Sequence, residues 1–136
     1  MFEILEHAAD VGFRAEAISL PELFENAAEA LVALAMETER IEAHESYPLE
    51  AEGEDIDSLL VNWLSEVLYY LDGRLLAMGR FQVSELTGER VRGAAMGERR
   101  DPSRHPARLI VKGITYHQLK IAHHVDRWVC EVFLDV

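Results

Sequence analysis

The chain has 136 residues, of which 49% are hydrophobic and 28% charged, and its formal net charge is -12 at pH 7. This size predicts one domain with one hydrophobic core, and the composition excludes long disordered or fibrous segments. No apolar run approaches the ~20 residues of a membrane helix, and the first residues lack the basic region and cleavage site of a secretory signal. We therefore expect a cytoplasmic protein that does not contact a membrane.

The negative charge is unevenly distributed along the chain. Residues 1–72 contain 18 acidic side chains and only two arginines, whereas residues 73–136 contain 11 basic and seven acidic side chains. A net negative chain repels phosphate backbones, so binding of nucleic acid by the whole surface is disfavoured and any RNA contact should be indirect or weak. Six arginines fall within residues 90–108. We interpret this stretch as a solvated loop, with an RNA or partner contact as the alternative.

The first half of the chain predicts two strands followed by a helix. Residues 2–5 are strand-like, and residues 11–18 alternate apolar and polar side chains, which is typical of a half-buried strand. Ser19 and Glu22 have the spacing of a capping box, so a helix should begin here. Apolar residues then recur at helical spacing as far as Ala35.

A second helix follows an acidic stretch. Residues 37–57 predict a loop with one short strand. Asp55 or Asp57 can act as the N-cap of the helix, and Trp63 lies on its apolar face, which predicts a core position. Gly73 should end the helix in the left-handed C-cap conformation.

The second half of the chain predicts a hairpin and a long pair of strands. Residues 75–96 form two strand-like runs joined by a glycine-containing turn, and residues 109–122 are rich in β-branched and aromatic side chains. Residues 123–127 should turn the chain back into a strand at residues 128–136. Because this last strand is apolar on much of both faces, we expect it to be central, with Cys130 in the core.

This order of elements predicts the fold class. It is α+β, with residues 1–136 forming a single two-layer domain in which a mixed β-sheet is covered by two long α-helices.

Catalytic motifs are absent from the sequence. It contains no nucleophile elbow, Walker A loop, dinucleotide-binding glycine pattern or metalloprotease helix, which argues against an enzyme. His44 and His105 fall in predicted loops, and His123 and His124 in a predicted turn, so we expect all four to be exposed. Neighbouring histidines often point apart, so this pair is weak support for a zinc site.

Two acidic residues interrupt otherwise apolar patterns. Asp10 lies between the first two strands, where its ordinary role would be to cap its own turn. Asp135 lies next to the α-carboxylate of Val136 at a strand end. Two carboxylates about 5 Å apart repel by roughly 3 kcal/mol at an effective dielectric constant of about 20, so a third acid would require a cation or a raised pKa. Oxygen ligands suit calcium or magnesium, but spacing alone does not bring Asp10 to Asp135.

Five short motifs occur in an order that resembles the archease family over nearly the whole chain. They are residues 7–11 (His-Ala-Ala-Asp-Val), 22–28 (Glu-Leu-Phe-Glu-Asn-Ala-Ala), 59–64 (Leu-Leu-Val-Asn-Trp-Leu), 112–117 (Lys-Gly-Ile-Thr-Tyr-His) and 134–136 (Leu-Asp-Val). Two positions depart from the family pattern. Ala8 replaces a threonine, which could weaken metal affinity, and Gly113 replaces an alanine, which should only loosen the strand.

The resemblance implies an accessory protein without catalytic residues of its own. Such a protein binds a tRNA-splicing RNA ligase and promotes its GTP-dependent guanylylation and multiple turnover in tRNA splicing and RNA repair. GTP would belong to the ligase, and the cofactor would be a divalent cation, calcium or alternatively magnesium. The residues implied for the site are the metal ligands Asp10, Asp135 and Val136, the partner-activating Lys112, and two supporting histidines, His7 and His117.

Two other functions remain open at this point. The family also suggests a chaperone-like modulator of a tRNA methyltransferase, whose basic RNA-binding surface the acidic first half could shield. An unrelated alternative is a metal-dependent phosphoesterase, which the missing nucleophile motif disfavours. It would use His7, Asp10, His117 and Asp135.

Overall fold

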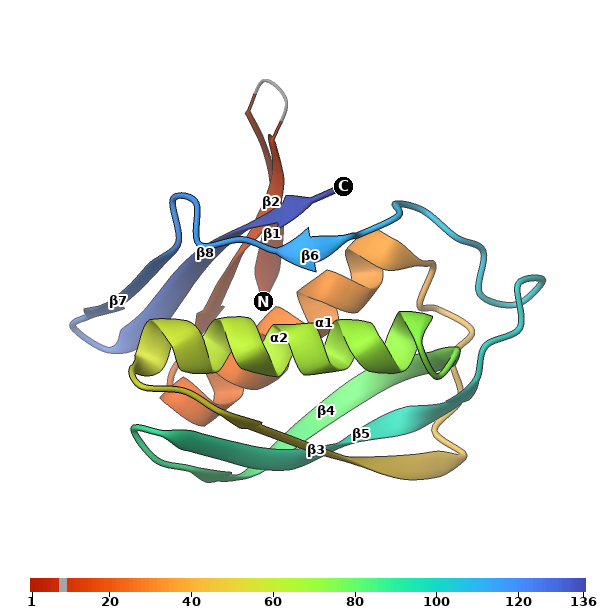
Figure 1. Ribbon diagram of the computed structural model, residues 1–136, viewed down its shortest axis with the longest axis horizontal. Helices are drawn as coiled ribbons and strands as arrows, with labels where there is room; N and C mark the ends of the chain where they lie inside the picture. The colour runs from red at the N-terminus through yellow and green to blue at the C-terminus, as the bar shows by residue number, and fades with distance from the viewer. Residues whose placement is uncertain (8–9) are drawn as a thin grey trace.

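The computed structural model describes residues 1–7 and 10–136, and the side chains of residues 1–5 and 11–136. Its elements are β1 (Phe2–His7), β2 (Asp10–Ala17), α1 (Leu20–Ala35), β3 (Glu45–Glu52), α2 (Ile56–Asp72), β4 (Leu76–Leu86), β5 (Arg90–Arg99), β6 (Gly113–Ile114), β7 (Lys120–His124) and β8 (Arg127–Asp135), as labelled in Figure 1.

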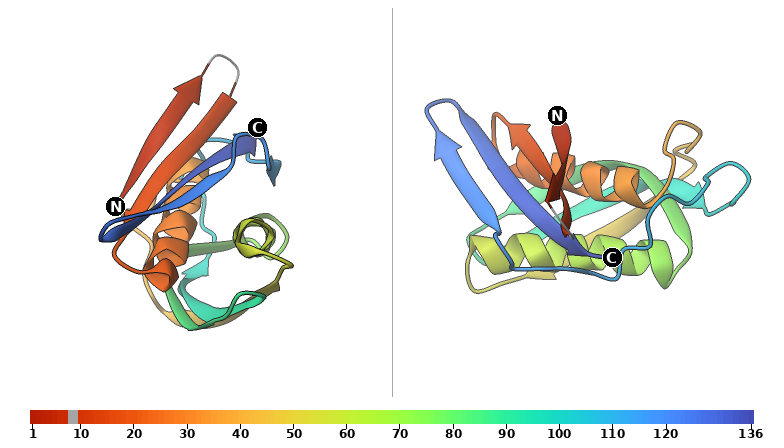
Figure 2. Two further views of the ribbon diagram at one scale, coloured as in Figure 1. Left: turned by 90° about the vertical axis from the view of Figure 1, so that its left-hand side faces the viewer. Right: turned by 90° about the horizontal axis from the view of Figure 1, so that it is seen from above.

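The strands form two sheets with the two helices between them (Figure 2). One sheet has the order β1-β2-β8-β6, with β7 also pairing with β8, and the other has the order β3-β5-β4. Helix α1 packs on β2 and β4, and α2 packs on β3 and β6. The α+β class with two long helices is thereby confirmed. The sequence suggested one mixed sheet, but the pairings of the described strands are antiparallel and divide between two sheets, because α1 is buried on two sides and can cover both.

One hydrophobic core joins the helices to both sheets. Trp63 and Cys130 are fully buried, as predicted. The indole Nε1–H of Trp63 donates to the carbonyl oxygen of Phe24 at 3.0 Å, which satisfies its only polar group. Burial raises the pKa of the Cys130 thiol to about 12, so this cysteine is a core residue and not a nucleophile.

The helix ends follow the predicted caps with one difference. The Ser19 hydroxyl accepts the Glu22 N–H at the start of α1, and the Asp55 carboxylate accepts the Ser58 N–H at the start of α2. Gly73 ends α2, but its φ of -81° is right-handed, so the predicted left-handed cap is wrong. A Cβ at residue 73 would lie 2.8 Å from the Tyr69 ring, so close packing explains the glycine.

The predicted long strand over residues 109–122 is also wrong. Only β6 and β7 form there, and Gln118 has a positive φ of 54° between them. The residues before β6 use their backbone differently, since the N–H groups of Arg108 and Leu109 donate to the last carbonyls of α1. These helix carbonyls would otherwise lack partners, so the segment caps a helix instead of extending a sheet.

The arginine-rich stretch is more ordered than predicted. Its first half is strand β5, and in its second half Arg104 pairs with Glu98 at 2.8 Å. His105 was expected to be exposed but is fully buried, because the buried Glu98 gives its ring a partner. His44, His123 and His124 are exposed, as predicted, but His123 and His124 lie in β7 and not in the predicted turn. In the part of the chain that the structure describes, neither helix has the length and apolar character needed to cross a membrane.

Candidate functional site

Strands β2 and β8 bring the two ends of the sequence together. They are antiparallel, and Val11 lies opposite Leu134 in the last pair of their register. The next residue on each strand is Asp10, the first residue of β2, and Asp135, the last residue of β8. The backbone therefore places Asp10 and Asp135 at the same end of the strand pair, which spacing in the sequence could not predict.

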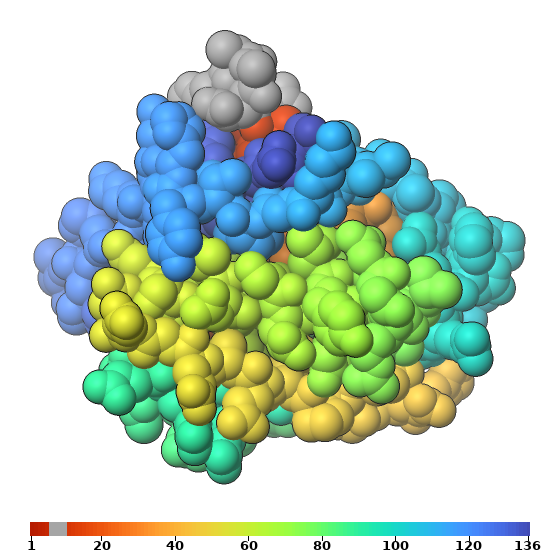
Figure 3. All heavy atoms as spheres, viewed as in Figure 1, coloured from red at the N-terminus to blue at the C-terminus, as the bar shows by residue number. Residues whose placement is uncertain are grey.

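The other side of β8 adds the segment with Lys112. Gly113 lies opposite Asp135, and the Lys112 N–H donates to the Asp135 carbonyl oxygen at 2.7 Å. The adjacent chain end, Val136, is 41% exposed. Figure 3 shows the last residues, in dark blue, at the surface beside the segment around β6. The backbones of Asp10, Lys112, Asp135 and Val136 thus gather at one end of the sheet.

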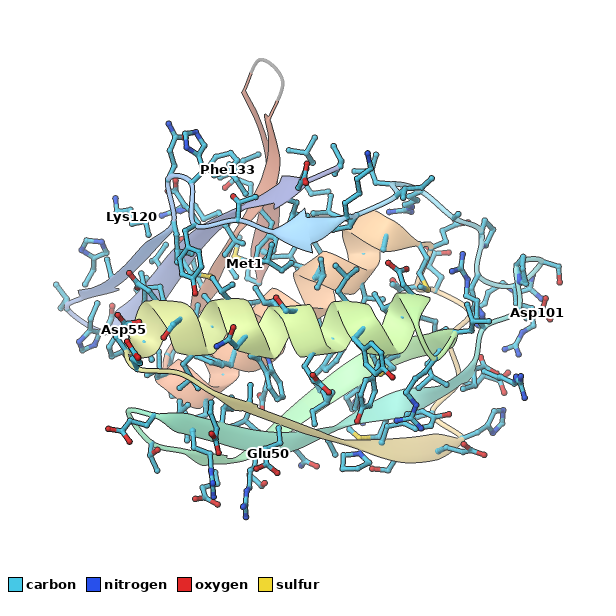
Figure 4. The ribbon with its side chains drawn as sticks, viewed as in Figure 1. Met1, Glu50, Asp55, Asp101, Lys120 and Phe133 are labelled. Atoms are coloured by element: carbon cyan, nitrogen blue, oxygen red, sulfur yellow. The ribbon has the colours of Figure 1, made fainter. Side chains whose placement is uncertain are left out.

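Gly12 permits the close approach of β2 and β8 at this end. A Cβ at residue 12 would lie 2.3 Å from the carbonyl oxygen of Val132 and 2.8 Å from Cδ1 of Phe133. Phe133, labelled in Figure 4, is only 3% exposed. Any side chain at residue 12 would have to push the strands or the Phe133 ring away, so the glycine that follows the first motif has a packing role.

Thr115 fixes the segment around β6 to β8 from the other side. Its N–H and its hydroxyl both donate to the carbonyl oxygen of Phe133, at 3.1 and 3.0 Å. The roles of Thr115 and Gly12 could not be predicted from the sequence pattern. The available signals were the place of Gly12 directly after the first motif and that of Thr115 inside the fourth.

The predicted site residues differ in how far the structure describes them. The side chains of His7 and Asp10, and the departure at Ala8, lie outside the described residues. Lys112 and Asp135 have exposed side chains, and His117 is exposed in the loop between β6 and β7. Gly113 has open space around its Cβ position, so the alanine of the family pattern would fit there.

The donor groups at this end of the sheet fit a hard divalent cation. Asp135 and the α-carboxylate of Val136 offer only oxygen atoms, the ligand type that calcium and magnesium prefer over zinc. Both residues are exposed, so water molecules could complete a coordination shell. Carboxylates held close together repel each other, and a bound cation would relieve such repulsion.

A second acidic group lies elsewhere, around Glu98. Ligand atoms of Glu42, His44 and Glu98 lie within 4.8 Å of one another. The Glu98 carboxylate already accepts the Glu42 N–H and hydrogen bonds from Arg104 and His105, and these hold its pKa down to about 2. Arg104 is also 3.3 Å from the Glu42 carboxylate. Because Arg104 compensates both acids, we interpret this group as an internal ion-pair network and not as a cation site.

Comparison with known proteins decides the family. The chain matches the model of the Archease protein family (MTH1598/TM1083) over residues 2–136. The chain belongs to the archease family. The family resemblance carried by the five short motifs is therefore confirmed.

Archeases of similar length match the whole chain. Protein archease of Methanopyrus kandleri is 40% identical over 140 residues, covering 99% of both chains. That of Pyrococcus furiosus is 39% identical over 139 residues, covering 99% of this chain and 98% of the relative.

Two solved structures have the same fold. The solution structure of Methanobacterium thermoautotrophicum protein 1598 is 34% identical, with a TM-score of 0.83 over 99% of this chain and 98% of that one. A Thermotoga maritima structure, described as an archease and possible chaperone, is 19% identical, with a TM-score of 0.59 over 97% of this chain and 94% of that one. At this identity the second likeness concerns the fold alone.

Proposed function

We propose that this archease activates a tRNA-splicing type RNA ligase by promoting its GTP-dependent guanylylation and turnover. GTP and the metal of the chemical step belong to the ligase, and the archease acts on it as an accessory protein in the cytoplasm. Membership of the archease family supports an accessory role, and the buried, weakly acidic Cys130 thiol offers no nucleophile.

The gathering of four motif residues at one end of a sheet is the observation that carries this proposal. The register of β2 with β8 and the hydrogen bond from Lys112 to Asp135 join three separate parts of the sequence there. Exposed polar groups at a sheet end can contact another macromolecule, whereas small-substrate sites are usually concave and largely apolar. The end of β8 is therefore suited to act on a partner.

Asp10, Asp135 and Val136 are the residues that would hold a divalent cation, calcium or magnesium. When bound, the cation would neutralise carboxylates that otherwise repel one another and any acidic partner surface. The chain's own contribution is to bring the backbones of these residues to one end of the sheet, which Gly12 allows on one side of β8 and Thr115 supports on the other.

Lys112 supplies a positive charge beside these acids. Its backbone is fixed to Asp135, while its side chain is exposed on a flexible four-carbon stem. A lysine ammonium in this setting can donate hydrogen bonds to a phosphate or carboxylate of the partner. We assign it the role of contacting the ligase during guanylylation.

A guanylylation assay with a purified ligase tests the proposal. The assay measures the initial rate at which the ligase acquires covalent GMP from GTP, with and without the archease. We expect wild type to raise this rate and Asp135→Asn to reduce the stimulation by at least about tenfold. Loss of a group that only supports a metal ligand already lowers metal affinity or activity by about tenfold or more. Asp126→Asn, an exposed acid in the β7–β8 turn, is the matched control and should behave as wild type. Equal stimulation by wild type and a folded Asp135→Asn variant would refute the proposed site.

A chaperone role toward a tRNA methyltransferase is the second candidate. It is favoured by the description of the Thermotoga maritima relative as a possible chaperone and by the acidic charge of residues 1–72. Binding to a methyltransferase that weakens with salt but is unchanged by Asp135→Asn would favour this role over ligase activation. Hydrolysis of a phosphodiester by the archease alone would instead support the phosphoesterase alternative.

A further inference from the structure

The buried pair of Glu98 and His105 lies outside the site described above. Glu98 is 8% exposed and His105 is fully buried, with 3.0 Å between the Glu98 carboxylate and Nε2 of His105. The Asp101 N–H donates to Nδ1 of His105 at 3.0 Å. Nδ1 is thus an acceptor, so the ring proton is assigned to Nε2, which donates it to Glu98.

Further contacts immobilise both members of the pair. Glu98 also accepts hydrogen bonds from the Glu42 N–H and the Arg104 guanidinium, both at 2.8 Å. The backbone carbonyl of His105 accepts a hydrogen bond from Nε of Arg100 at 3.0 Å. His105 is therefore held to β5 by its side chain and to the loop by its backbone.

The chain continues from His105 along the end of α1. Three backbone hydrogen bonds join it there: Glu37 N–H to the Pro106 carbonyl (3.0 Å), Arg108 N–H to the Ala35 carbonyl (2.9 Å) and Leu109 N–H to the Leu34 carbonyl (3.1 Å). Figure 1 shows this stretch passing from β5 around the end of α1 to β6. Its path is thus fixed first at His105 and then at the helix.

The same stretch ends at the candidate site. Val111 is 3% exposed, and the next residue is Lys112, whose N–H donates to the Asp135 carbonyl oxygen. Residues 106–112 thus form an extended segment held at one end by the Glu98–His105 pair and at the other by β8.

We propose that Glu98 and His105 are positioning residues for Lys112. This inference rests on the proposed role of Lys112 in ligase activation. The pair anchors residues 106–112 so that the Lys112 side chain starts from a fixed point beside Asp135. Without the anchor, the segment would keep its bonds to α1 and β8 and the burial of Val111, but it would lose its fixed start at His105, and the ammonium group would sample more positions. Loss of positioning of this kind lowers the effective concentration of a reacting or contacting group.

Two substitutions at His105 separate positioning from packing. In His105→Gln the side-chain amide can reach the former position of Nε2 and donate to Glu98. In His105→Asn the shorter side chain can replace Nδ1 as the acceptor of the Asp101 N–H but cannot reach Glu98. Both remove the buried ring, so a purely structural role predicts similar losses from the two variants.

The experiment measures amide hydrogen exchange by NMR and ligase guanylylation with the same full-length variants. For His105→Asn we expect faster exchange at Arg108, Leu109 and Lys112 and a stimulation reduced on the order of tenfold. For His105→Gln we expect both measurements close to wild type. Glu98→Gln, which keeps the size of the side chain, replaces His105→Asn if that variant does not fold.

The outcomes that contradict the inference are distinct from those that contradict the proposed function. Unchanged exchange at Lys112 in His105→Asn would overturn the inference. So would faster exchange in His105→Asn together with full stimulation of the ligase, provided that Lys112→Ala abolishes the stimulation. Equal behaviour of the Asn and Gln variants would assign His105 to packing alone. If Lys112→Ala itself leaves stimulation intact, the proposed role of Lys112 fails, whereas the exchange data still decide whether the pair positions the segment.

Discussion

Single residues at the end of β8 are matched to the backbone around them. Gly12 leaves space for the Phe133 ring and the Val132 carbonyl, and Thr115 donates twice to the Phe133 carbonyl. Neither residue carries charge, yet both contact the strand that ends at Asp135. Patterning could assign Trp63 and Cys130 to the core, because burial follows hydrophobicity, but it could not predict these roles, because each depends on a partner distant in the sequence.

Substitution of Gly12 should destabilise the fold. Gly12→Ala places a Cβ 2.3 Å from a backbone carbonyl oxygen, so strands β2 and β8 must separate locally. Overpacking of this kind costs about 1–3 kcal/mol of unfolding free energy, measurable by urea denaturation. Gly113→Ala is the matched control on the neighbouring strand, where open space makes the change neutral. Equal stability of the two variants would contradict the packing role of Gly12.

At the scale of elements, the sequence predicted what local periodicity controls. Both helices, their N-caps, the β4–β5 hairpin and the central last strand were anticipated correctly. The strand expected over residues 109–122 is divided into the short strands β6 and β7, and the start of that segment bonds to the end of α1 instead. The prediction that His105 is exposed was wrong for a similar reason, since only the tertiary structure brings Glu98 to its ring.

The network that joins β5 to its neighbouring loops should make stability depend on pH. Hydrogen bonds from the Glu42 N–H, Arg104 and His105 lower the pKa of Glu98 from 4.5 to about 2. The folded state therefore binds this proton more weakly than the unfolded state does. The contribution of Glu98 is fully present above about pH 4.5 and is lost as the pH falls toward 2.

Urea denaturation of wild type and Glu98→Gln across this pH range measures that contribution. We expect the variant to be less stable than wild type at pH 6 and the difference to shrink steadily between pH 4.5 and 2. Glu89→Gln, which changes an exposed carboxylate in the β4–β5 turn, should show a smaller difference at pH 6. A difference for Glu98→Gln that does not change with pH would contradict the assigned network.

For the whole molecule, the arrangement of two sheets around two helices brings distant segments to one sheet end. The α+β class followed from the order of elements, but the division into two sheets did not, because strand partners are set by long-range packing. The same holds for the site. The family resemblance implied Asp10, Lys112, Asp135 and Val136, and the strand register supplies the physical reason why their backbones lie at one end.

The central claim is that this end of the sheet, including the chain terminus, acts on a partner ligase. The most direct test compares the initial rate of ligase guanylylation in the presence of wild type and of a variant extended by three glycines after Val136. The extension moves the α-carboxylate away from Asp135 and leaves every side chain unchanged. We predict that wild type accelerates guanylylation and that the extended protein, at equal stability, stimulates it at least about tenfold less. Equal acceleration by both proteins would contradict the claim.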